Sequence, residues 1–274
     1  MKRLIIMLLA LTCIMSCKEE KAPETKTNTA TQPEKFVPSI EYTIGESLPH
    51  DTNSYTEGLL FHDQQLFEST GSPQGLPNTK SIVGPVDPKT GKIIVKAELD
   101  KNQYFGEGIV FLNDKLYQLT YTTQIGFIYD AKSFKQIGRF SFSNTEGWGL
   151  TTDGKSIIMS DGSNTLTYLD PVTLKPTKTL NVRNAGYAED YLNELEYING
   201  FIYANIWTKN YIVKIDPASG DVVGIIDLSI LKERAASKHA QADVVNGIAY
   251  NPDTDKIYVT GKLWPEIYEI KFKH

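Results

Sequence analysis

A short pattern occurs five times in this chain of 274 residues, and it restricts the possible folds more than any other feature. Each copy has a small or polar start, an apolar run, a turn and a second apolar run. The copies are spaced by 50, 41, 45 and 53 residues between the anchor positions Gly58, Gly108, Gly149, Glu194 and Gly247. A repeat of this length that holds two hairpins is typical of a β-propeller blade. The sequence therefore predicts an all-β fold, a five-bladed propeller of four-stranded antiparallel blades.

The fifth copy is one strand short, because the chain ends soon after its third apolar run at residues 266–272. We expect the early run Ser39–Ile44 to supply the missing outer strand. N- and C-terminal strands would then close the ring and leave no exposed sheet edge along it. One helix is expected between the fourth and fifth blades, over residues 228–237.

The first residues have the features of an export signal. A basic start at residues 1–3 precedes an apolar run at 4–11 that is too short to span a membrane. Residues 14–17 resemble the cleavage box of bacterial lipoproteins, in which Cys17 would carry the lipid. We predict a signal peptide at 1–17 and a lipid anchor in a bacterial cell envelope membrane, the outer membrane, on its periplasmic or surface side. An ordinary secretory signal with an incidental cysteine is the alternative.

Residues 18–36 are rich in Lys, Glu, Thr, Pro and Ala and contain almost no bulky apolar side chain. Such a segment cannot bury enough surface to offset its ordering entropy, so we predict a disordered tether. The propeller with the functional site would then span 37–274. With the signal removed, Cys17 is the only cysteine, so no internal disulfide can form. A net charge of −5 without a basic cluster argues against a nucleic-acid partner, and we expect a monomer.

The alignment of the repeats predicts which side chains meet at one mouth of the central channel. The residue before each anchor should point toward the axis, and these residues are Glu57, Glu107, Trp148, Asn193 and Asn246. The second strand of each repeat ends near the same mouth, at Gly71, Tyr121, Gly162, Trp207 and the pair Gly261–Lys262. Carboxylates, amides, aromatic rings and a lysine around one opening are typical of a small-ligand site. The four histidines lack metal-ligand spacing, so no metal ligand is predicted.

Each of these side chains also has a purely structural interpretation. Glu57 and Glu107 could bond backbone amides at strand starts, and the two asparagines could be local caps. Trp148, Trp207 and Tyr121 could belong to the core, and Lys262 could be solvated. Three large aromatic residues at equivalent mouth positions favour a pocket.

Several segments at these positions resemble the plant and bacterial type of glutaminyl-peptide cyclotransferase. They are Phe105-Gly-Glu-Gly-Ile, Thr145-Glu-Gly-Trp-Gly, Leu192-Asn-Glu-Leu, Ala204-Asn-Ile-Trp and Val259-Thr-Gly-Lys-Leu-Trp-Pro. The resemblance extends in order over residues 40–272. It implies a five-bladed propeller that converts the N-terminal glutamine of peptides or proteins into pyroglutamate and releases ammonia. It also implies that zinc and other cofactors are not required for the chemistry, while a structural metal in the channel is left open.

The resemblance assigns roles to individual residues. The catalytic glutamate falls on Glu107, the pocket tryptophans on Trp148 and Trp207, the asparagine on Asn193 and the lysine on Lys262. Substrate binding would also involve residues around them, namely Tyr55, Glu57, Tyr121 and Asn246.

Two positions depart from the family pattern, which usually has glutamine at position 57 and tryptophan at position 121. Glu57 places a second carboxylate near Glu107 and should raise the pKa of one of the two. The departure could retune the pH optimum, change the substrate or mark a member without activity.

Two other functions remain open on the residues alone. A non-catalytic surface receptor could hold peptide N-termini or other small ligands at the same mouth, because paired carboxylates suit a protonated amine. A calcium-dependent propeller lactonase or hydrolase would need carboxylate and amide ligands, of which Glu57, Asn193 and Asn246 are a partial set.

Overall fold

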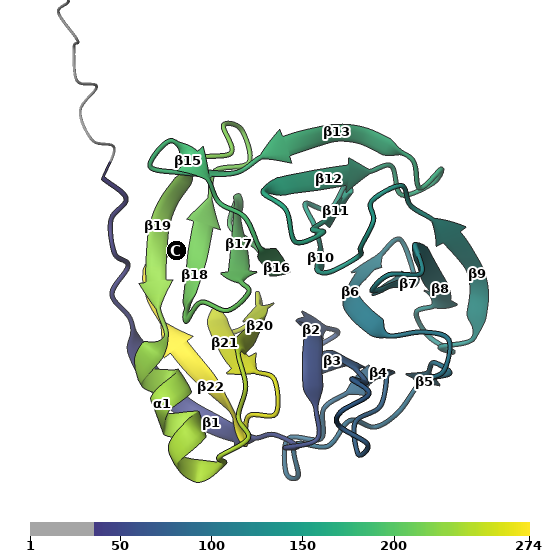
Figure 1. Cartoon of the computed structure of the whole chain (residues 1–274), viewed down its shortest axis with the longest axis horizontal. Helices are drawn as coiled ribbons and strands as arrows, with labels where there is room; N and C mark the ends of the chain where they lie inside the picture. The colour runs from purple at the N-terminus through teal and green to yellow at the C-terminus, as the bar shows by residue number, and fades with distance from the viewer. Residues whose placement is uncertain (1–35) are drawn as a thin grey trace, which may run out of the picture. The chain divides into compact units, whose positions relative to one another are not determined.

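Twenty strands form five four-stranded antiparallel sheets around a central axis (Figure 1). The structure is a computed structural model, and it describes residues 36–274. The five-bladed propeller predicted from the repeats is confirmed. The signal peptide, the lipid attachment at Cys17 and the tether up to residue 35 lie outside the described residues, so they stay predictions. In the described part, no helix has the length and apolar character needed to cross a membrane.

In each blade the first strand of the repeat lies at the axis. Blade 1 contains β2 (Tyr55–His62), β3 (Gln65–Gly71), β4 (Ile82–Pro85) and β5 (Ala97–Glu98). Blade 2 contains β6 (Gly106–Leu112), β7 (Lys115–Thr120), β8 (Ile125–Asp130) and β9 (Gln136–Ser141). Blade 3 contains β10 (Leu150–Thr152), β11 (Ile157–Met159), β12 (Thr165–Leu169) and β13 (Pro176–Asn181). Blade 4 contains β16 (Leu192–Ile198), β17 (Phe201–Ile206), β18 (Tyr211–Ile215) and β19 (Val222–Asp227). Blade 5 contains β20 (Val245–Asn251), β21 (Lys256–Gly261), β22 (Glu266–Lys271) and β1 (Thr43–Pro49).

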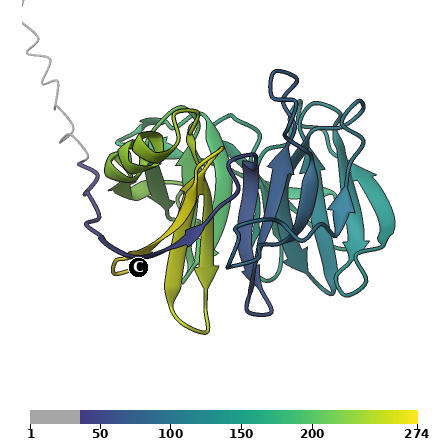
Figure 2. The ribbon, with the colours of Figure 1, turned by 90° about the horizontal axis from the view of Figure 1, so that it is seen from below.

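Two elements lie between blades. A short hairpin of β14 (Arg183–Asn184) and β15 (Tyr187–Ala188) connects blade 3 to blade 4. Helix α1 (Ser229–Lys238) connects blade 4 to blade 5, as predicted, and buries Leu231 and Ala235. Figure 2 shows the ring from the side, with the strands running between its two faces.

The N-terminal strand closes the ring, but this strand begins and ends later in the sequence than we expected. The outer strand of blade 5 is β1 (Thr43–Pro49), which pairs with β22, whereas we predicted Ser39–Ile44. The earlier residues pair instead with blade 4, where the Ile40 N–H donates to the Ile225 carbonyl at 2.7 Å. Ile40 and Ile44 pack against the apolar cluster of blades 4 and 5. The apolar run Ser39–Ile44 therefore connects blade 4 to blade 5. Its pairing with β22 begins only at the end of the run.

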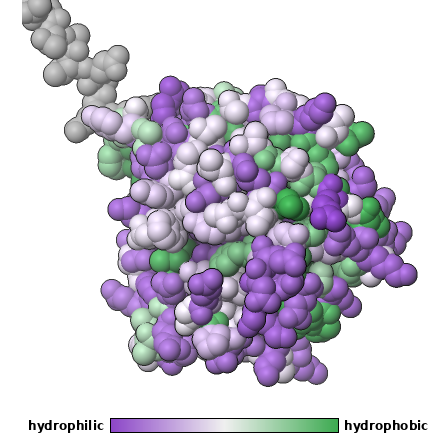
Figure 3. Space-filling view, turned by 45° about the vertical axis from the view of Figure 1, so that its right-hand side comes forward, coloured by the Kyte–Doolittle hydropathy of each residue, from purple (hydrophilic) through white to green (hydrophobic). Residues whose placement is uncertain are grey.

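Apolar side chains fill the spaces between adjacent blades. Successive residues of a strand point to opposite faces of the sheet. In β6, Ile109 belongs to the same apolar cluster as Phe67 of blade 1, and the next residue, Val110, belongs to the cluster of Ile157 of blade 3. The inner strands are therefore buried on both faces, while the outer strand β13 is mostly exposed. On the face shown in Figure 3, hydrophilic residues predominate and hydrophobic ones lie between them in small groups.

The repeated anchor position brings the inner strands close together at the axis. A Cβ atom on Gly108 would lie 2.6 Å from the backbone of blade 3, so only glycine fits there. Blade 4 has Glu194 at this position. Its carboxylate accepts hydrogen bonds from the Leu59 N–H of blade 1, at 3.1 Å, and the Ile248 N–H of blade 5, at 2.8 Å. Burial raises the pKa of Glu194 well above its ordinary value. This carboxyl group links three blades beneath the mouth.

Candidate active site

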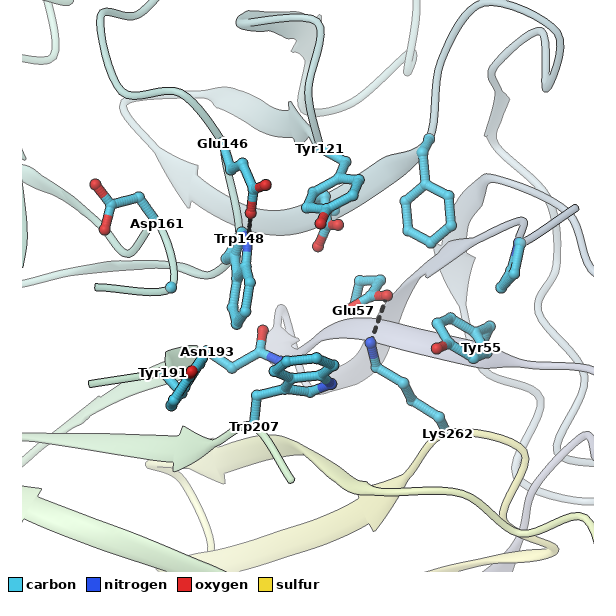
Figure 4. Close-up of a pocket in the computed structure, with 14 residues that line it drawn as sticks. Tyr55, Glu57, Tyr121, Glu146, Trp148, Asp161, Tyr191, Asn193, Trp207 and Lys262 are labelled. Atoms are coloured by element: carbon cyan, nitrogen blue, oxygen red, sulfur yellow. Dashed lines mark hydrogen bonds and ion pairs between the residues drawn. The ribbon is translucent and has the colours of Figure 1, made fainter. Parts of the chain in front are cut away.

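A cavity of about 500 Å³ opens at the mouth where the inner strands begin (Figure 4). Most of the residues predicted for the site line it. They are Tyr55, Glu57, Glu107, Tyr121, Trp148, Asn193, Trp207 and Lys262. Asn246 does not line the cavity; it is buried beneath Glu57.

The blade repeat explains why these side chains converge. Tyr55, Glu57, Glu107 and Asn193 lie on the first residues of inner strands. Tyr121, Trp207 and Lys262 directly follow the second strands of blades 2, 4 and 5. Since the first two strands of a blade are antiparallel, the start of one lies beside the end of the other. All five blades therefore present these positions at the same face of the ring.

Glu57 is the most constrained carboxylate of the site. Its Oε1 atom lies 2.6 Å from the Lys262 Nζ atom, and both side chains are almost completely buried. The Asn246 amide donates to the Glu57 Oε2 atom at 3.3 Å and to the Thr56 carbonyl at 2.9 Å. The Lys262 ammonium also lies 4.4 Å from the centre of the Tyr55 ring, in cation–π geometry. Glu57 and Lys262 thus form a buried ion pair between blades 1 and 5.

Glu107 forms no ion pair with a lysine, arginine or histidine of residues 36–274. Burial raises its pKa well above the ordinary value, and the neighbouring Glu57 carboxylate raises it further, both through its charge and through a hydrogen bond between the two side chains. The Lys262 charge opposes this shift only partly. Burial also raises the pKa of Glu57 above its ordinary value, and the Lys262 charge and the hydrogen bonds to Lys262 and Glu107 oppose this rise. The predicted rise in the pKa of one member of the pair is confirmed for Glu107.

His50 and Glu68 form a second buried pair. Both nitrogens of the His50 ring face acceptors: the Nδ1 atom faces the Trp264 carbonyl at 2.8 Å, and the Nε2 atom faces Glu68 at 3.0 Å. Burial alone would lower the pKa of His50, but the charge of Glu68 and these hydrogen bonds raise it. The Thr56 hydroxyl donates to the same carboxylate at 2.7 Å. This pair joins the strand of Glu57 to the loop of Lys262.

Aromatic side chains form the opposite wall of the cavity. The Trp148 and Trp207 rings meet edge to face, with their centres 5.8 Å apart. The Trp148 indole donates to Glu146 at 2.8 Å. Burial raises the pKa of Tyr121, with a further contribution from Glu146. Glu146 therefore holds the Trp148 ring in place, and its charge acts on the Tyr121 hydroxyl.

Asn193 offers a free acceptor to the cavity. Its side-chain Oδ1 atom is buried, and within residues 36–274 no donor reaches it. Its backbone carbonyl accepts the Ser160 hydroxyl at 2.7 Å, which holds the strand in place. A buried amide oxygen without a partner is costly, and such groups often mark a ligand site.

Comparisons with known proteins agree with this geometry. A family profile described as "Glutamine cyclotransferase" matches residues 8–272. This chain belongs to the glutamine cyclotransferase family. It is 43% identical to a glutaminyl-peptide cyclotransferase of Arabidopsis thaliana over 235 residues, which cover 85% of this chain and 72% of that protein. It also resembles the crystal structure of Myxococcus xanthus glutaminyl cyclase, with a TM-score of 0.76 and 33% identity over 86% of this chain and 98% of that one.

Several residues that line the cavity of this cyclotransferase family member were not predicted as site residues. They are Pro73, Phe105, Glu146, Asp161 and Tyr191. Phe105 and Glu146 lie two residues before Glu107 and Trp148, in segments that the resemblance already included, so alternation along an extended chain could have indicated them. Asp161 precedes Gly162, and Tyr191 lies two residues before Asn193.

Two glycines at the mouth make room for aromatic rings of the site. A Cβ atom on Gly71 would lie 2.2 Å from the Phe105 ring, and one on Gly162 would lie 2.7 Å from the Trp148 ring. The absent side chains give these rings their space. Within the described residues, no three His, Cys, Asp or Glu side chains are grouped as a metal site requires.

Proposed function

We propose that this protein is a glutaminyl-peptide cyclotransferase, which converts the N-terminal glutamine of peptides or proteins into pyroglutamate and releases ammonia. The observation that carries the proposal is the protonatable Glu107 in an aromatic-walled cavity, in a chain that belongs to this family. The α-amine nitrogen of the substrate attacks the carbon of its own side-chain amide. A new C–N bond closes the five-membered ring, and the C–N bond to the amide nitrogen breaks.

Glu107 moves the proton in this mechanism. As a carboxylate it takes a proton from the attacking amine, and as a carboxylic acid it gives that proton to the leaving ammonia. The α-amine itself titrates near pKa 8, so its neutral form is accessible near neutral pH. A group that both accepts and donates works best when its pKa lies near the working pH, and burial shifts Glu107 in that direction.

Lys262 and Asn193 stabilise the oxygen of the tetrahedral intermediate. Lys262 uses one N–H for Glu57 at 2.6 Å and keeps others for the cavity. Asn193 contributes its side-chain amide from the neighbouring blade. Donors of this kind contribute roughly 3 kcal/mol where they have been removed from other enzymes.

The aromatic wall orients the substrate. Trp148, Trp207 and Tyr121 enclose the two methylene groups of the glutamine side chain and favour its folded-back conformation. Both reacting groups belong to one molecule, so freezing this conformation can account for a large part of the rate enhancement.

Ammonia release from a glutaminyl dipeptide amide, with and without a chelator, tests the proposal. We expect pyroglutamyl product and one ammonia per turnover, with the rate unchanged by the chelator. Binding without turnover would instead support a receptor. Ammonia release that the chelator abolishes and calcium restores would show that a metal ion takes part in the reaction, which contradicts the mechanism proposed here. Glu57 already holds the Lys262 ammonium, which does not favour the calcium-dependent lactonase alternative.

A further inference from the structure

Two exposed aromatic side chains continue the wall of the cavity to its rim. Trp207 is 40% exposed and Tyr191 is 49% exposed, yet both line the cavity. Their ring centres lie 5.8 Å apart with the planes inclined at 54°, and Trp207 contacts Trp148 on its other side. Figure 4 shows Tyr191 and Trp207 on the same side of the cavity as Asn193. An apolar surface therefore runs from the inner wall to the solvent.

The backbone at Tyr191 is held in an unusual conformation. Its φ angle is +67°, in the left-handed region that bulky side chains rarely adopt. Two hydrogen bonds hold it there: the Tyr191 N–H donates to the Gly162 carbonyl at 2.8 Å, and the Trp207 N–H donates to the Tyr191 carbonyl at 2.9 Å. Strained positions of this kind are concentrated at functional sites, because only the surrounding structure maintains them. The strain here places the tyrosine ring at the rim.

The rim lies on the path by which a bound peptide would leave the cavity. The first residue of a peptide occupies the inner cavity, with its amine beside Glu107. The rest of the peptide must leave through the opening, and the cavity of about 500 Å³ lies in the size range that holds ligands larger than one residue. The second residue therefore passes the rim.

The charge at the mouth is predominantly negative. Glu57, Glu107, Glu146 and Asp161 line the cavity, and Lys262 is the only lysine or arginine among the lining residues. Its ammonium is already paired with Glu57. An acidic side chain near the opening would meet like charges without a free cation.

We propose that Tyr191 and Trp207 form the binding site for the second residue of the substrate, and that this site favours an aromatic side chain and disfavours an acidic one. The proposal rests on the cyclotransferase function proposed above. Contacts between aromatic rings in proteins correspond to about two- to tenfold in an equilibrium or rate constant.

The test compares kcat/KM for three peptides, Gln-Phe-amide, Gln-Ala-amide and Gln-Glu-amide. In the unmodified protein we expect the order Phe, Ala, Glu, with about two- to tenfold between the first two. In Tyr191→Ala the Phe/Ala ratio should fall toward one. Tyr187→Ala is the matched control, because Tyr187 is 80% exposed and is not part of the cavity lining; it should keep the ratio. An unchanged ratio in Tyr191→Ala, or an equal fall in the control, would overturn the proposal.

A binding measurement separates this proposal from the proposed function. Two of the three tryptophans line the cavity, so quenching of their fluorescence reports occupancy without turnover. We expect pyroglutamyl-Phe-amide to bind more tightly than pyroglutamyl-Ala-amide, and Tyr191→Ala to remove the difference. If no glutaminyl peptide is turned over, the cyclotransferase function fails, whereas equal binding of the two products by the unmodified protein contradicts the rim site itself.

Discussion

Glu57 and Glu107 occupy equivalent positions in neighbouring blades, one residue before the anchor glycine, and yet their surroundings differ. Both are buried, with 2% and 4% of their surface exposed. Glu57 binds the Lys262 ammonium and the Asn246 amide. Glu107 faces mainly another carboxyl group, which raises its pKa further than burial alone does.

The comparison shows that the repeat sets the location of a side chain and the neighbouring blades set its chemistry. In blade 5 the second strand ends at Gly261, and the next residue, Lys262, reaches across to Glu57 of blade 1. Blade 3 instead places Trp148 among the lining residues. The same residue type in the same backbone context is therefore an ion-pair partner in blade 1 and, in the function that we propose, a proton carrier in blade 2.

Replacing Glu107 by glutamine should have the largest effect on activity. The substitution keeps the size and shape of the side chain but removes its proton transfer, so we expect kcat/KM for a glutaminyl dipeptide amide to fall by about 10²–10⁴-fold. Ammonia release measures the rate, and thermal unfolding checks that the fold is retained. Activity close to that of the unmodified protein would exclude Glu107 as the acid–base group.

Replacing Lys262 by methionine should have the largest effect on stability. It leaves Glu57 buried without a cation, and breaking a buried pair in this way typically costs about 3–5 kcal/mol of unfolding free energy. Because the unpaired carboxyl groups then have raised pKa values in the folded state, the loss should grow as the pH rises and shrink as they become protonated. Urea unfolding at several pH values measures it.

The double variant Lys262→Met with Glu57→Gln is the matched control for this stability effect. Removing both charges removes the unpaired carboxylate, so the double variant should be more stable than Lys262→Met alone. If the two substitutions destabilise additively, the ion pair does not account for the effect.

Much of this architecture is predictable from the spacing of the repeats. The alignment placed Glu57, Glu107 and Asn193 at one mouth because equivalent positions of a propeller surround one axis. The prediction that an N-terminal strand closes the ring is confirmed, but the strand was placed too early, because the first residues of the apolar run Ser39–Ile44 pair with blade 4. An apolar pattern indicates that a segment is buried, but it does not identify the strand with which that segment pairs.

The remaining details depend on contacts between blades, which the repeat does not encode. Lys262 and Glu57 are 205 positions apart in the sequence. The alignment places both at the same mouth, but it does not indicate which of the two carboxylates the lysine binds. Asn246 aligns with residues of the lining but lies under Glu57. Tyr191 falls outside the aligned positions, and a tyrosine gives no sequence signal for a positive φ angle of the kind that Gly or Asn would give.

Replacing Glu57 by glutamine should have the smallest effect on kcat/KM at the optimal pH and should lower the pKa of Glu107 toward its ordinary value. The substitution keeps an oxygen for Lys262 and removes the charge that raises the pKa of Glu107, so this pKa should fall. Since Glu107 must be ionised to accept a proton, the acidic limb of the profile of kcat/KM against pH should move to lower pH. Glu146→Gln should cause a smaller shift in the same direction, because the Glu146 charge raises the pKa of Glu107 less than Glu57 does. An acidic limb that stays in place in Glu57→Gln would mean that Glu57 does not set the pKa of Glu107, and the contrast between the two carboxylates would then depend on the ion pair of Glu57 with Lys262.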